Sequence, residues 1–237
     1  MTHPIITIDG PSGAGKGTIA YRLAEHFGFN LLDSGALYRI VGLLAYQQGI
    51  LTDGILQGES DVEFESKVAN LTQSLAIDFI INQDSKSVEI VIDGIPLADN
   101  IRTETVGAYA SKVATLPAVR TALLGVQRNM ALRAGLVADG RDMGTVIFPE
   151  ATAKIFLTAS SQARAQRRVK QLGEKGMAVD YEQILAEINA RDEQDQNRAV
   201  APLKPAGDAL IIDSSDLTID EVLAKCVAFC QTAINDA

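Results

Sequence analysis

Short apolar runs alternate with amphipathic segments along the first part of the chain. The β-branched run from Pro4 to Asp9 ends in a glycine-rich stretch, and residues 17–27 then repeat apolar positions at helical spacing. Leu31 and Leu32 form a second short run before another helical pattern that starts near Asp33. This order of strand, loop, helix, strand and helix favours a parallel α/β sheet.

The stretch from residue 52 to residue 100 has a different pattern. Residues 75–81 and 88–92 resemble strands and flank the turn-forming segment 82–85, which predicts a hairpin in an inserted subdomain. Two helices should follow, separated near Pro117, because proline disfavours helix at the residue before it. The second helix should run toward Leu132 and stop before Gly135.

Three later apolar runs, at residues 136–138, 154–157 and 209–212, are short enough to be buried strands. With the first two runs they predict a five-stranded parallel sheet flanked by helices. We therefore expect an α/β fold, with a core formed by residues 1–51 and 101–237. An α+β insert should occupy residues 52–100, and a short helical lid should lie at about residues 160–180.

Composition and charge exclude several classes of protein. Hydrophobic residues make up 47% of the 237 residues and charged residues 22%, as in a folded globular protein. The net charge of -9 argues against binding long nucleic acid, which requires many basic contacts to phosphates. No apolar run approaches the roughly 20 residues that span a bilayer, and the first residues lack the signal-peptide pattern. We expect a cytoplasmic protein without membrane partners.

The two cysteines lie four residues apart, at Cys226 and Cys230, in a segment with helical spacing. That spacing places both thiols on one face of a helix, where burial is the expected state. Neither His3 nor His26 has metal-site spacing relative to them, so no zinc site is predicted.

The sequence that follows the first strand predicts a phosphate-binding loop. Glycines there allow backbone N–H groups to surround phosphate oxygens, the helix start adds partial positive charge, and Lys16 can reach the β- and γ-phosphates. Gly17 departs from the strict pattern, which has Ser or Thr as a magnesium ligand directly after the lysine. Magnesium should then be held mainly by nucleotide oxygens and water, with Thr18 placed to contact a phosphate or the metal. The loop consists of Gly10, Pro11, Ser12, Gly13, Ala14, Gly15, Lys16, Gly17 and Thr18. With this loop, the expected five-stranded parallel α/β sheet is of the P-loop NTPase type.

Two polar groups later in the chain are candidates for the rest of the site, each with a structural alternative. Asp139 and Asp142 follow the run at 136–138, where open α/β sheets bind ligands, although a polar loop is the alternative. The spacing of Arg191, Asp195 and Arg198 predicts one stripe on a helix, which on spacing alone is a salt-bridged surface.

A third group begins a helix that Ser160 or Ser161 should cap. Arg164, Arg167 and Arg168 form either a solvated basic face or a lid that supplies arginines to the transferring phosphoryl group.

The chain resembles the bacterial cytidylate kinase family over nearly its whole length. The resemblance rests on the blocks IDGPSGAGKGT, LLDSGALYR, IRT, ADGRDMGTVIFP, KIFLTAS and RDEQDQNRAVAPL, in this order. Gln194 and Gln196 depart from it, because the family often has arginine there. The resemblance implies phosphoryl transfer from ATP with Mg²⁺ to CMP or dCMP. This reaction requires no general base, because the acceptor phosphate oxygen is largely ionised at pH 7.

By the same resemblance, Lys16, Arg168 and Arg191 carry catalysis, and the cytosine ring is read by Ser111, Arg120 and Asp142. Arg191 and Asp195 would lie near the sugar, and the phosphate contacts would be Ser34, Tyr38, Arg39, Arg141 and Arg198. Asp139 completes the substrate-binding set. Without the resemblance, Ser111 and Arg120 read as exposed helix residues and Tyr38 as a core aromatic.

Two alternative functions remain at this point. One is another small-molecule kinase on the same scaffold, for uridylate, adenylate or an alcohol, and the pair of Asp142 and Arg120 argues for a cytosine edge over uracil. The other is a nucleotide switch without an acceptor, for which the guanine-reading N-K-x-D tetrapeptide is missing. Nothing in the pattern demands more than a monomer.

Overall fold

The computed structural model describes residues 3–57, 62–82, 87–97, 100–132, 134–174, 176–177, 180–198 and 200–236. Contacts divide the chain into two compact units, one formed by residues 1–29 and 135–237 and the other by Asn30–Ala134. The predicted insert, residues 52–100, lies within the second unit. In the described part of the chain, no helix is long and apolar enough to cross a membrane.

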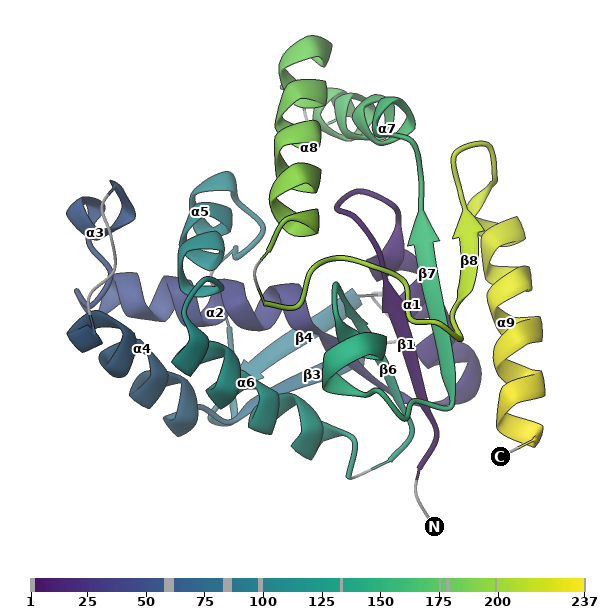
Figure 1. Ribbon diagram of the computed structural model, residues 1–237, viewed down its shortest axis with the longest axis horizontal. Coiled ribbons are helices and arrows are strands. Elements are labelled where there is room, and N and C mark those ends of the chain that lie inside the picture. The colour runs from purple at the N-terminus through teal and green to yellow at the C-terminus, as the bar shows by residue number, and fades with distance from the viewer. Residues whose placement is uncertain are drawn as a thin grey trace. The chain divides into compact units, whose positions relative to one another are not determined.

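The predicted five-stranded sheet is confirmed, with the strand order β2-β6-β1-β7-β8 (Figure 1). Its strands are β1 (Ile5–Asp9), β2 (Asn30–Asp33), β6 (Leu136–Gly140), β7 (Ala153–Thr158) and β8 (Leu210–Asp213). Strand β1 pairs in parallel with β6 and β7, and β7 pairs in parallel with β8. Ile6, Ile8, Leu136 and Val137 have no exposed surface, as expected for strands covered on both faces.

The helices of the first unit are α1 (Lys16–Phe27), α7 (Ser161–Glu174), α8 (Tyr181–Gln196) and α9 (Ile219–Asn235), with a π-helix η1 (Met143–Ile147) after β6. Helix α9 packs against α1 and β7. Its buried face carries Cys226 and Cys230, as the spacing predicted, and burial raises the pKa of each thiol to about 12. Helices α7 and α8 contact each other beyond the end of β7 (Figure 1).

The second unit combines helices with a small sheet. Its helices are α2 (Ser34–Gln47), α3 (Asp53–Gln57), α4 (Val62–Ser74), α5 (Glu104–Val113) and α6 (Pro117–Met130). The predicted hairpin is confirmed as the antiparallel pair β3 (Ile77–Asn82) and β4 (Ser87–Ile92), extended by β5 (Ile95–Pro96). Residues 83–85 of the predicted turn lie outside the described residues.

Close packing of α2 on α5 explains why a glycine lies in the middle of α2. A Cβ on Gly42 would come within 2.8 Å of the Tyr109 backbone and side chain. The Tyr46 and Tyr109 rings stack nearby, with centroids 4.5 Å apart.

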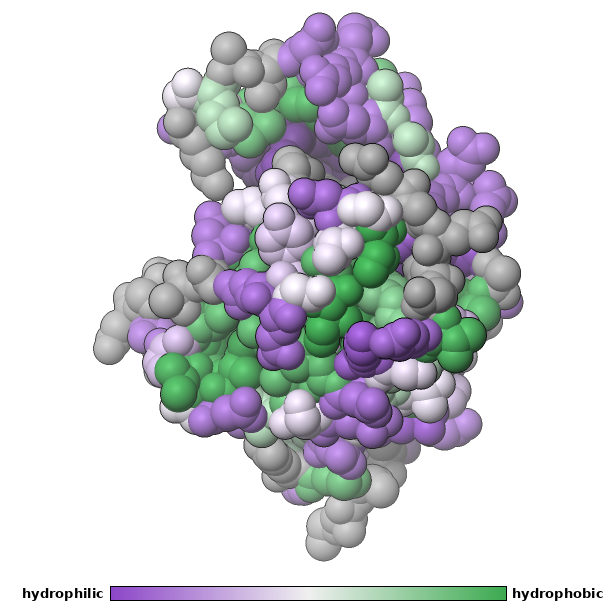
Figure 2. All heavy atoms as spheres, turned by 90° about the vertical axis from the view of Figure 1, so that its left-hand side faces the viewer, coloured by the Kyte–Doolittle hydropathy of each residue, from purple (hydrophilic) through white to green (hydrophobic). Residues whose placement is uncertain are grey.

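On the face drawn in Figure 2, hydrophobic atoms in green are interspersed with hydrophilic ones in purple.

Candidate active site

The phosphate loop predicted at residues 10–18 connects the end of β1 to the start of α1. Gly10 has a φ of 149°, and a Cβ there would lie 1.9 Å from the carbonyl oxygen of Leu157 on β7. Gly15 is the N-cap of α1 with a φ of 93°, a conformation that favours glycine. The loop therefore leads from the carboxyl end of a central strand directly into a helix N-terminus, an arrangement that suits an anion.

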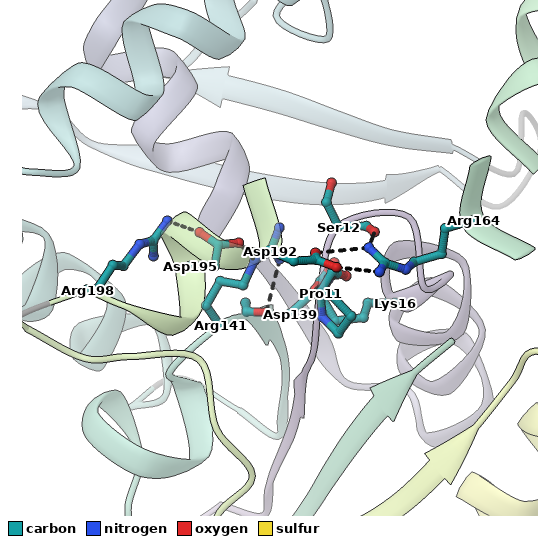
Figure 3. A network of polar contacts seen from close by, with 10 residues as sticks. Pro11, Ser12, Lys16, Asp139, Arg141, Arg164, Asp192, Asp195 and Arg198 are labelled. Carbon is teal, nitrogen blue, oxygen red and sulfur yellow. Dashed lines mark hydrogen bonds and ion pairs between the residues drawn. The ribbon is translucent and has the colours of Figure 1, made fainter. Parts of the chain in front are cut away.

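Lys16 is the first residue of α1 and is only 6% exposed. Its Nζ donates to the Pro11 carbonyl oxygen at 2.9 Å and lies 3.9 Å from the Asp139 carboxylate on β6 (Figure 3). The phosphate loop thus curls around its own lysine. Phosphate oxygens entering the loop would replace a neutral carbonyl as the partner of this ammonium group.

Asp195 connects the carboxyl end of α8 to the loop after β6. Arg141 Nε donates to Asp195 at 2.8 Å, and Arg198 donates to the other carboxylate oxygen (Figure 3). Asp195 is 1% exposed, whereas Arg191 is exposed. Two arginines around one carboxylate leave a net positive charge, which fits an anionic ligand.

The prediction of one helical stripe is wrong for Arg198. Helix α8 ends at Gln196 with Asn197 as its C-cap, so Arg198 lies beyond the helix. The chain turns back immediately, because the Leu203 N–H donates to the Asp195 carbonyl at 2.9 Å. Arg198 reaches Asp195 from this turn.

Arg164 joins the phosphate loop to helices α7 and α8. Ser160 caps α7, as predicted, by accepting the Ala163 N–H at 3.2 Å. Arg164 is 3% exposed and donates to the Ser12 carbonyl at 3.0 Å and to both carboxylate oxygens of Asp192 (Figure 3). Its Nε donates to the Ala159 carbonyl at 3.0 Å. The solvated-face interpretation is therefore wrong for this arginine.

The other two arginines of α7 differ from Arg164 in their surroundings. Arg167 donates to the Ser214 hydroxyl at 3.3 Å, which links α7 to the end of β8. Arg168 is half-buried on the same helix. The role of residues 160–180 as a lid stays a prediction.

Asp9, a residue that the sequence patterns did not single out, holds the loop after β6. Its carboxylate accepts the N–H groups of Met143 and Gly144, each at 2.8 Å. It is 4% exposed, and burial raises its pKa to about 6 despite these two donors. Asp142, which is 6% exposed, directly precedes the two bonded N–H groups. In the sequence, the signal that could have identified Asp9 is an aspartate at the end of an apolar strand, directly before a phosphate loop.

The remaining predicted residues lie in the second unit, around α2. Ser34 is 5% exposed at the start of α2, and the preceding Asp33 caps this helix by accepting the Ala36 N–H at 2.9 Å. Arg39 donates to the carbonyls of Ile101 and Thr103 at 2.9 and 3.0 Å. These bonds attach the IRT segment to α2.

Two further residues of this set come from α5 and α6. Arg120 on α6 lies over the Tyr38 ring, with its guanidinium carbon 6.0 Å from the ring centroid, and Tyr38 is half-buried. Ser111 on α5 is exposed and donates to the Gly107 carbonyl of its own helix at 3.0 Å. The structure thus pairs Tyr38 with Arg120 and leaves the Ser111 hydroxyl facing its own helix backbone.

The donor set suits magnesium that arrives with a nucleotide. No group of three or more His, Cys, Asp or Glu side chains able to hold a metal occurs among the described residues. Next to the phosphate loop the structure offers Asp139, 13% exposed by side chain, and the exposed Thr18. Both are oxygen donors, which Mg²⁺ prefers, and nucleotide phosphates would supply the other ligands.

A parallel sheet with a glycine-rich loop at the end of β1, a lysine at the start of α1 and an arginine of α7 bonded to that loop is the arrangement of a phosphotransferase of the P-loop class. The family model for cytidylate kinase matches residues 6–232. The chain belongs to the cytidylate kinase family.

Curated relatives agree over almost the whole chain. A cytidylate kinase of Aeromonas salmonicida is 50% identical, covering 99% of this chain and 96% of that protein. One from Vibrio cholerae is 49% identical, covering 98% of this chain and 97% of its own. Among solved structures, an uncharacterized protein from Eubacterium ventriosum has the same fold at 14% identity, with a TM-score of 0.51 over 97% of this chain and 99% of its own.

Proposed function

We propose that this chain transfers the γ-phosphoryl group of ATP to CMP or dCMP, giving ADP and CDP or dCDP. The observation that supports this most strongly is about 50% identity to cytidylate kinases over at least 98% of the chain. The geometry of the first unit supports phosphoryl transfer, because it combines a phosphate loop with the buried Arg164, which is bonded to that loop, and with Arg141 and Arg198, which meet at the buried Asp195.

The donor nucleotide is assigned to the phosphate loop. Backbone N–H groups at the start of α1 would bind the β-phosphate, and Lys16 would turn from the Pro11 carbonyl toward the γ-phosphate. Arg168 on α7 and Arg191 on α8 are assigned to the charge that develops on the transferring group. Thr18 and Asp139 are the protein oxygens closest to hand for a Mg²⁺ ion brought in with ATP, which would be held mainly by nucleotide oxygens and water and would neutralise part of the phosphate charge.

The acceptor is assigned to the residues that the resemblance to cytidylate kinases implies. Ser34, Tyr38, Arg39, Arg141 and Arg198 would hold the monophosphate, and Arg191 and Asp195 the sugar. For the base, Asp142 would accept the N4 amine of cytosine, and Arg120 with Ser111 would donate to its N3 and O2 acceptors. Uracil presents a carbonyl at C4, so its oxygen would face the Asp142 carboxylate.

Chemistry requires no general base, because the acceptor phosphate oxygen is already largely ionised at pH 7. Catalysis then depends on aligning this oxygen with the γ-phosphorus and on stabilising the negative charge of the transition state. Exclusion of water from the reacting group limits hydrolysis of ATP, which is the proposed role of the lid.

A coupled assay of ADP release tests this assignment, with CMP, dCMP, UMP and AMP compared at equal concentration. We expect selective turnover of CMP and dCMP. The variant Asp142→Asn replaces an acceptor with an amide that also donates, so it should raise the ratio of UMP to CMP turnover. Asp93→Asn, in the turn after β4, is the matched control. Preference for UMP or AMP in the unsubstituted protein would overturn the base assignment, and no turnover with any acceptor would support a nucleotide switch.

We also propose that the protein acts as a cytoplasmic monomer that binds small nucleotides. Its net charge of -9 supports the further proposal that it does not bind long nucleic acid. Light scattering on a sizing column should give a mass near 25.3 kDa with and without ATP and CMP. Twice that mass would refute the monomer.

A further inference from the structure

Asp9 binds two consecutive backbone N–H groups that lie 134 and 135 residues away in sequence. It is the last residue of β1, and its neighbour across the sheet is Gly140 at the end of β6. The two bonds therefore attach the loop after β6, defined as residues 141–144 and including the first two residues of η1, to the strand that leads into the phosphate loop. Arg141 and Asp142 are the two charged residues of this loop, beside the buried Met143.

The peptide group between Asp142 and Met143 is hydrogen-bonded through both its N–H and its carbonyl. The N–H of Met143 belongs to the same peptide group as the carbonyl of Asp142, and this carbonyl accepts the N–H groups of Val146 and Ile147 at 2.9 and 3.1 Å. With Asp9 holding the N–H side, the ψ angle of Asp142 has little freedom. The direction in which the Asp142 side chain leaves the backbone is then set by Asp9.

Tight packing prevents the loop from adjusting elsewhere. A Cβ on Gly144 would lie 2.8 Å from the Thr7 hydroxyl, and a Cβ on Gly140 would lie 2.8 Å from the Met143 side chain. Met143 itself has no exposed surface. The loop has room for one arrangement, and Asp9 supplies its two polar contacts to β1.

We propose that Asp9 is a positioning residue for acceptor recognition, which holds the loop so that Asp142 and Arg141 face the monophosphate substrate in a fixed orientation. This inference rests on the proposed function of Asp142 and Arg141. It assigns to Asp9 no contact with either substrate. Its effect should therefore appear in the choice and binding of the acceptor, and not in the binding of ATP.

The variant Asp9→Asn tests this inference because it keeps the size of the side chain. The amide oxygen of Asn can still accept one of the two backbone N–H groups. The amide nitrogen is a donor, so it cannot accept the second N–H group and is repelled by it. Since a misplacement of about 1 Å can cost on the order of 100-fold in rate, we expect kcat/KM for CMP to fall by about 10-fold to 100-fold. KM for CMP should account for most of this change, and KM for ATP should stay within about two-fold.

Selectivity is the readout that a merely structural role would not change. The ratio of kcat/KM for CMP to that for UMP should fall at least about ten-fold in Asp9→Asn, because the orientation of Asp142 is what excludes uracil. Asp93→Asn is the control, since Asp93 also accepts a backbone N–H, from Ala76 at 2.9 Å, but lies in a turn of the second unit. It should leave the ratio unchanged.

Two outcomes would overturn the inference: an unchanged ratio of CMP to UMP turnover in a folded Asp9→Asn protein, or a KM for ATP raised by much more than about two-fold. If Asp9→Asn is insoluble, the smaller Asp9→Ala, which removes both acceptor oxygens, is measured with the same readouts. Failure of the proposed function is recognised separately, because Asp142→Asn would then leave the ratio unchanged in a protein with an intact Asp9.

Discussion

Replacing Asp192 with Asn should destabilise the protein far more than replacing an exposed partner in an otherwise similar ion pair. Asp192 binds the guanidinium of Arg164 through both carboxylate oxygens, and the Arg164 side chain is 3% exposed. The comparison pair is Arg22 with Asp220, whose side chains are 38% and 85% exposed. Both pairs join segments distant in sequence within the first unit.

The loss of stability depends on the surroundings of the charge that remains after its partner is removed. Removing one partner of a buried pair costs about 3 to 5 kcal/mol, because the other charge stays buried without compensation. Arg164 keeps its bonds to the carbonyls of Ser12 and Ala159, so the lower end, about 3 kcal/mol, is expected for Asp192→Asn. Asp220→Asn should cost about 1 kcal/mol or less, since water replaces the lost partner.

Urea unfolding followed by circular dichroism measures both variants, because the chain has no tryptophan for fluorescence. In thermal unfolding, about 3 kcal/mol corresponds to a fall in Tm of about 6 to 12 °C for a protein of this size, compared with about 4 °C or less for Asp220→Asn. Equal losses in the two variants would refute the reasoning that burial decides the cost.

Three further predictions concern other sites. Native protein at pH 8 should not react with a thiol reagent, because Cys226 and Cys230 are buried with pKa values raised to about 12, whereas urea should expose both; rapid native labelling would contradict this. Burial raises the pKa of Asp9 from 3.8 to about 6, so the folded state binds its proton more tightly; the resulting stability is present below pH 3.8 and is lost as pH rises through about 6. At 1.36 kcal/mol per pKa unit, this shift corresponds to about 3 kcal/mol in the free energy of unfolding. The urea midpoint of Asp9→Asn minus that of the unsubstituted protein should therefore rise between pH 4 and pH 7, and a difference that does not change with pH would refute this prediction. Gly10→Ala should yield no soluble protein, because its Cβ would lie 1.9 Å from the Leu157 carbonyl oxygen, whereas Gly125→Ala, in open space on α6, should stabilise the fold by up to about 1 kcal/mol; a soluble, active Gly10→Ala protein would refute the packing argument.

The sheet was predictable because buried parallel strands have a simple signature. Each is a short apolar run, and the glycine-rich loop after the first run identifies the end of β1. Strand order was not predictable, since β6 and β7 flank β1 through pairings that span more than 100 residues. No local pattern encodes which distant run becomes a neighbour.

The arginines show where local patterns fail. Arg164 has the spacing of an exposed helical face, yet its partners, Ser12 and Asp192, lie 152 and 28 residues away. Arg198 has the spacing of a helix with Asp195 but follows the end of α8, because spacing does not mark where a helix stops. For the acceptor residues, the resemblance to a family supplied what spacing could not. Their roles stay predictions.

The bonds of Arg164 have a kinetic consequence. Helix α7 cannot leave the phosphate loop without breaking the bond to Ser12, and α8 cannot leave α7 without breaking the bonds to Asp192. These bonds share one guanidinium group, so the two helices should open together in a single step. Relaxation-dispersion measurements on amides of the loop, α7 and α8 should therefore report one common exchange rate.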